Sequence, residues 1–144
     1  MAEPDHRSTP AATPLVSAAV MVPLYVSGVF REAPASFRAQ LIETLMRPMG
    51  ALGLVAVAGG VFAAVRQRHG WARLQVSIDD AARITADQVQ ELSAYLQQAA
   101  PEVFRQVAEL VVSQPAVAGG LSAVLLLHVL HTTRKRQAPA LRPA

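Results

Sequence analysis

Cysteine is absent from this chain, so disulfides, cysteine-ligated zinc, thiolate nucleophiles and iron–sulfur clusters are all excluded. Aromatic residues are scarce, at 5% of the sequence, and they do not alternate with basic residues as they do in base-stacking surfaces. The net charge is only +3, which does not favour a nucleic-acid partner. We therefore expect neither thiol chemistry nor nucleic-acid binding.

Charged residues are also in short supply. They make up 16% of the 144 residues, whereas 52% are apolar, and a soluble domain usually carries about a quarter charged residues. The apolar residues are gathered into uncharged runs, and the Ala-, Val- and Arg-rich composition is typical of a bacterial genome of high GC content. We predict an all-α integral membrane protein of a bacterial inner membrane, built as a helical hairpin with two or three membrane helices and in contact with the lipid bilayer.

The apolar runs and the polar stretches between them divide the chain into seven segments. Two runs are long enough to reach the lower limit for a membrane helix, and each ends at basic residues. The run at 15–33 is shorter, and it is either a short membrane helix or a re-entrant or interfacial segment. The predicted segments are a disordered tail at 1–14, the apolar segment at 15–33, an amphipathic interfacial helix at 34–48, a membrane helix at 49–65, an extramembrane amphipathic region at 66–114, a second membrane helix at 115–133 and a basic tail at 134–144.

Basic residues and a tryptophan at the ends of the runs predict how the protein is oriented. Cytoplasmic loops carry an excess of Lys and Arg, and Trp favours the membrane interface. The side that holds the C-terminal tail has the larger basic group, so we expect a cytoplasmic C-terminus and an extracytoplasmic 66–114 region. The membrane-orienting residues are Arg66, Arg68, Trp71, Arg134, Lys135 and Arg136.

Small residues recur on one face of each predicted membrane helix. Membrane helices associate where small side chains let their backbones approach closely, so these faces predict a packing interface between the two helices or with other subunits. An equally weighted alternative is that an Ala- and Gly-rich sequence produces such stripes by chance. The residues are Gly53, Ala56, Gly60, Ala63, Ala116, Gly119, Gly120 and Ala123.

An apolar stripe at helical spacing runs through the polar region. Thr85 and Gln88 form a capping box before it, and Pro101 either starts a second helix or kinks the first. The stripe is too narrow for a core of its own, so we expect it to bind a copy of the chain, a partner or the membrane surface. Its residues are Val89, Leu92, Leu96, Val103, Val107 and Leu110.

No catalytic arrangement is found in the sequence, and we expect no enzymatic activity, cofactor or metal. His128 and His131 are the sharpest candidates, because residues three apart share a helix face and could ligate a metal or haem. The favoured interpretation is that both are polar residues near the headgroups. Asp79 and Asp80 suit the start of a helix better than a cation site.

Three functional hypotheses remain open. The first is a non-catalytic accessory or structural subunit of a larger membrane complex, assembled through the small-residue faces and the extramembrane helix with other subunits or its own copies. The second rests on the short spans and basic tail, which resemble those of phage holins, proteins that oligomerise into membrane lesions; the long loop fits holins poorly. The third is an amphipathic coat protein on granules or membrane surfaces.

Overall fold

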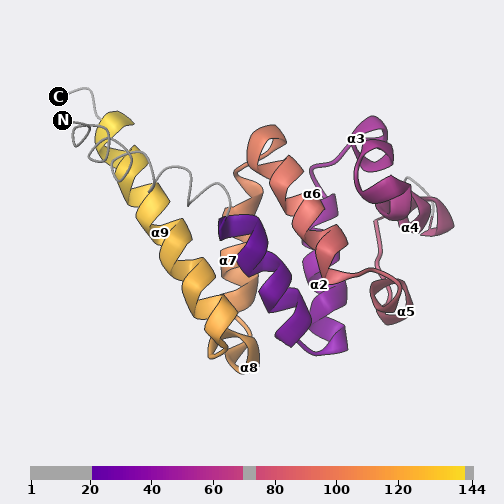
Figure 1. The fold of residues 1–144 in the computed structure, drawn as a ribbon, viewed down its shortest axis with the longest axis horizontal. Helices are drawn as coiled ribbons and strands as arrows, with labels where there is room; N and C mark the ends of the chain where they lie inside the picture. Colours follow the sequence, from indigo (N-terminus) through magenta and orange to yellow (C-terminus); the bar gives the residue numbers. More distant parts are fainter. Residues whose placement is uncertain (1–20, 70–73, 142–144) are drawn as a thin grey trace, which may run out of the picture.

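The computed structural model describes residues 21–69 and 74–141 (of residues 69 and 133–141, the backbone alone), and every regular element in this part is a helix (Figure 1). The all-α prediction is confirmed. A helix over residues 21–32 comes first. The helices that follow are α2 (Ala35–Met46), α3 (Ala51–Ala56), the 3-10 helix η1 (Ala58–Gly60), α4 (Val61–His69), α5 (Ile78–Ala82), α6 (Ala86–Ala99), α7 (Val103–Val112), α8 (Pro115–Ala118) and α9 (Leu121–Leu141).

Helix α2 lies at the centre of the hydrophobic core, where it contacts α5, α6 and α7. Phe37, Leu41 and Leu45 follow at four-residue spacing and are all buried, because residues four apart share one face of a helix. The segment predicted as an interfacial helix at 34–48 is therefore a core helix, and its apolar stripe packs within the protein.

The 66–114 region folds into the end of α4 and three further helices. Helix α6 begins at the predicted capping box: the Gln88 backbone N donates to Thr85 Oγ1 at 3.2 Å, and the Thr85 backbone N donates to Gln88 Oε1 at 2.9 Å. Pro101 separates α6 from α7, since proline lacks a backbone donor. The two-helix alternative is thus confirmed over the single kinked helix.

The stripe predicted to bind a partner is internal. Val89, Leu92 and Leu96 of α6 are wholly buried, as are Val103 and Val107 of α7, while Leu110 packs half-buried against the same core. The sequence pattern predicts that this stripe needs a packing partner, and that partner is helix α2 of the same chain together with its neighbours. The predicted segments place residues 34–48 at the membrane interface and the other apolar runs in membrane segments, which removes them as packing partners.

The run at 49–65 is not one helix. Val57 is extended, and Ala58, Gly59 and Gly60 have positive φ angles of 52°, 65° and 82°, so α3 ends before α4 begins. Glycine enters this region without a steric penalty. The side chain of Glu91 on α6 supports the turn, because its Oε2 accepts a hydrogen bond from the Ala58 backbone N at 2.7 Å. The prediction of a continuous membrane helix here was wrong.

The run at 115–133 is also divided. Helix α8 ends at Ala118, Gly119 and Gly120 form the connection, and α9 starts at Leu121 and continues to Leu141. In the described part of the chain, no helix combines the length and the apolar character needed to cross a bilayer. The predicted membrane hairpin therefore has no support from these helices.

Two of the predicted features lie outside the described residues. These are the tail at 1–14 and Trp71. The apolar segment at 15–33 is described from residue 21 onward, where it forms a helix that buries Val22, Val26 and Val29.

Candidate interaction surface

Helix α9 lies along one flank of the molecule, with α3, α4 and α5 on the opposite side (Figure 1). It contacts α7 and α8. It also meets the helix over 21–32: a Cβ at Gly28 would lie 2.3 Å from Ser122 Oγ, so glycine permits this close approach. Ser122 Oγ donates a hydrogen bond to Glu32 Oε2 at 2.6 Å. These contacts fix which face of α9 points inward.

The inward face of α9 is apolar and covered. Ala123 and Leu126 are buried, and Leu130 is half-buried against the same core. These residues follow at i, i+3 and i+7, the spacing of one helix face. The side chains that hold α9 in place therefore occupy one side of the helix.

The outward face of α9 is also apolar in its first turns. Leu121 is 71% exposed and Val124 is 51% exposed. His128 and His131 follow on the same face and are exposed, since positions i, i+3, i+7 and i+10 lie within about one third of the helix circumference. We call these four residues the α9 surface.

The helix that carries the α9 surface continues into the basic end of the chain. The helical backbone runs without a break through Arg134, Lys135 and Arg136 to Leu141. No acidic residue occurs in the sequence after Glu109. An apolar helix face thus leads into a stretch whose formal charges are all positive.

The histidines of the α9 surface are the predicted low-probability ligands. Both are exposed, and within the described residues no three or more His, Asp or Glu side chains are grouped so that they could hold a metal ion. His128 and His131 are thus exposed polar members of the α9 surface.

The two predicted small-residue faces meet different partners. Gly53 approaches Tyr95 of α6, because a Cβ there would lie 3.2 Å from the tyrosine Oη. Gly120 approaches Glu32, whose Oε1 would lie 2.9 Å from such a Cβ. The remaining positions divide into buried Ala63 and Ala123, exposed Ala56, Ala116 and Gly119, and half-buried Gly60 in the turn.

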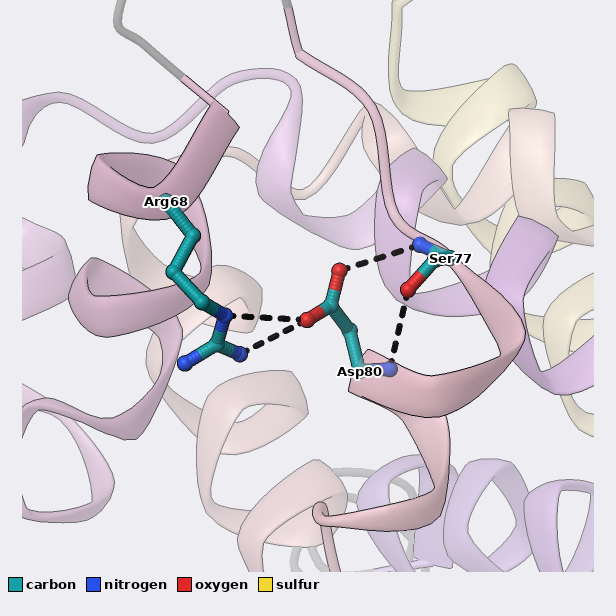
Figure 2. Close-up of polar contacts among 3 residues, drawn as sticks. All are labelled: Arg68, Ser77 and Asp80. Carbon is teal, nitrogen blue, oxygen red and sulfur yellow. Dashed lines mark hydrogen bonds and ion pairs between the residues drawn. The ribbon is translucent and has the colours of Figure 1, made fainter.

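Arg68, predicted to orient the chain at a membrane, forms a tertiary ion pair instead (Figure 2). Its Nη2 and Nε donate to Oδ1 of the buried Asp80 at 2.7 and 3.1 Å. Asp80 Oδ2 accepts from the Ser77 backbone N, and Ser77 Oγ accepts from the Asp80 backbone N, both at 3.1 Å. The acidic pair thus starts α5, as predicted, and Asp80 also joins α5 to α4. Arg66 is half-buried.

A second exposed apolar site lies on α3, away from α9. Leu52 is 88% exposed and Val55 is 59% exposed, while Leu54 between them is buried. Helix α3 has six residues, so this site is shorter than the α9 surface, although its leucine and valine are the more exposed pair.

Sequence reasoning missed the α9 surface because it treated Leu121 and Val124 as part of a membrane helix whose packing face was the stripe of small residues. The apolar signal was present, but the inward face is set by Gly28 and Glu32, about 90 residues away. No protein-family model, curated protein or solved structure matches this chain.

Proposed function

We propose that this protein is a non-catalytic accessory subunit of a membrane protein complex, and that it attaches through the α9 surface. The observation that carries the proposal is the exposure of Leu121 and Val124 on a helix whose opposite face is already packed. A helix that is apolar on both sides needs cover on both sides, and the chain covers one.

Covering the exposed apolar residues of this surface adds to the free energy of association. Covering a fully exposed leucine or valine side chain is worth about 1.5–3 kcal/mol. With Leu121 at 71% and Val124 at 51% exposure, covering both contributes about 3 kcal/mol, which is roughly a hundredfold in affinity. Contiguous exposed apolar surface of this kind marks binding sites on natural proteins.

This proposal replaces the two membrane spans by a peripheral attachment. Of the predicted small residues, Ala63 and Ala123 are buried, and Gly53 and Gly120 approach other side chains of the chain itself, so the attachment is assigned to the α9 surface. We keep the hypothesis of an accessory role because the exposed apolar residues of the α9 surface offer a place where another component can bind.

Mild-detergent extraction of the tagged protein from its host tests the proposal, with native mass determination and identification of co-purifying proteins. We expect a stoichiometric set of membrane proteins with the wild-type chain and its loss with L121S/V124S. L52S is the control, because it removes a leucine at the α3 site that is even more exposed, at 88% against 71% for Leu121, and it is expected to retain the partners.

Other results would contradict the accessory role in distinct ways. A pure homo-oligomer that collapses the membrane potential of the host would support the holin-like hypothesis. Recovery on granules without other membrane proteins, with release by carbonate, would support the coat hypothesis. Retention of partners by L121S/V124S would remove α9 as the attachment surface.

A further inference from the structure

The formal charge of the chain is divided unevenly along its length. The sequence holds 13 basic and 10 acidic residues, and all 10 acidic residues precede residue 110 while four of the basic residues follow it. Residues 110–144 therefore carry +4 and residues 1–109 carry −1. The positive net charge of the protein comes from the segment that contains α9.

The apolar and basic parts of this segment share one continuous helix. Arg134 lies 13 residues after Leu121 in α9, which corresponds to roughly 20 Å along the axis at about 1.5 Å per residue. Three basic residues in succession extend over the next turn. The exposed leucine and valine occupy one end of the helix and the basic group lies toward the other.

We infer that the α9 surface binds the surface of an anionic lipid bilayer, with Leu121 and Val124 at the acyl boundary and the basic residues 134–136 among the headgroups. The inference rests on the proposed membrane-accessory function and names what the surface contacts. Interfacial helices bury an apolar face about 5–10 Å deep and gain further affinity from Lys and Arg that face anionic lipids.

An anionic bilayer complements this surface in charge, and it can cover α9 beside the subunits of the complex. A protein interface of standard size covers about 800 Å² on each partner, whereas the large apolar residues exposed on the α9 surface are Leu121 and Val124. An anionic bilayer needs no matching shape. It attracts a basic segment that contains no acidic residue wherever the segment touches the bilayer surface. Each Lys or Arg near such a surface raises binding about fivefold.

The test is co-sedimentation of the purified full chain with vesicles of phosphatidylcholine alone or of phosphatidylcholine and phosphatidylglycerol in a 7:3 ratio. At low salt we expect binding to the anionic vesicles to be about thirtyfold stronger or more, and to weaken as salt is raised. R134Q/K135Q/R136Q is expected to reduce this preference to within about threefold, because glutamine keeps helix propensity while removing charge.

R31Q/R83Q/R105Q is the matched control, since it removes three exposed arginines outside the acid-free segment. We expect it to keep the anionic preference, and circular dichroism verifies that both triple variants remain helical. L121S/V124S is expected to lower binding to both vesicle types about tenfold or more.

The outcomes separate this inference from the proposed function. Equal binding to both vesicle types, or equal loss of preference in the two triple variants, would overturn the anionic-lipid assignment. If the wild-type chain binds neither vesicle but still co-purifies with membrane proteins through Leu121 and Val124, the partner is a protein; the inference fails and the accessory function stands. If it binds anionic vesicles but never recovers a partner, the accessory function fails and the lipid surface stands.

Discussion

Substitution of Gly28 by alanine tests the contact that orients α9. The added Cβ would lie 2.3 Å from Ser122 Oγ and 2.9 Å from Ser122 Cβ, both closer than van der Waals contact. Alanine is favoured over glycine within a helix by about 0.5–1 kcal/mol, whereas overpacking of a well-packed site costs about 1–3 kcal/mol. We expect a net loss of about 1–2 kcal/mol in the free energy of unfolding.

The assay is urea unfolding followed by circular dichroism at 222 nm. Gly119→Ala is the control, because Gly119 has a right-handed backbone and its Cβ would meet nothing closer than the Pro115 carbonyl oxygen at 3.8 Å. Its unfolding free energy should stay equal or rise by about 0.5 kcal/mol. We therefore expect the same Gly→Ala change to lower the free energy of unfolding at Gly28 and to leave it equal or raise it at Gly119.

A double-mutant cycle identifies the contact as the cause. Ser122→Ala alone removes the hydrogen bond to Glu32 and should cost about 1 kcal/mol. In the Gly28→Ala background the same change also relieves the closest clash, so it should cost less or become favourable. A Gly28→Ala protein as stable as the wild type, with additive effects in the cycle, would refute the close packing of α9 on the helix over 21–32.

Three further changes test the core and the turns by the same unfolding measurement. Ser93→Ala should stabilise the protein by about 1 kcal/mol, because Ser93 Oγ is buried without a hydrogen-bond partner among the described residues; a loss would reveal a partner. Asp80→Asn should cost about 2 kcal/mol, since it removes a buried charge paired with Arg68; a variant as stable as the wild type would contradict the contribution of this pair. Ala58→Gly should gain about 0.5 kcal/mol at a φ of 52°, and destabilisation would speak against the left-handed turn.

The predicted membrane helices have no support among the described residues, for one physical reason. An uncharged run such as 49–65 has the same composition whether lipid or protein covers it. The structure covers Leu54, Phe62 and Val65 with other parts of the chain. Once those residues belong to a core, the amphipathic stripe on α6 and α7 also finds its partner inside the molecule.

The two Gly-Gly pairs have a different role in the structure from the one that the sequence predicts. Gly59–Gly60 and Gly119–Gly120 lie within the predicted membrane helices, and Gly60, Gly119 and Gly120 are among the predicted packing residues. In the structure the first pair takes positive φ angles and the second connects α8 to α9. A glycine serves either purpose, and only the path of the chain on both sides distinguishes them.

The sequence by itself determined the helical class and the local starts and stops of helices. The Thr85–Gln88 capping box, the acidic start of α5, and the helix breaks near Pro101 and Pro115 depend on contacts within a few residues, which spacing alone reveals. Only the tertiary structure decided which apolar faces are covered and which are free. The contact of Glu32 with Ser122 joins positions 90 residues apart; such pairs leave no periodic signal, yet they set the face of α9 that remains exposed.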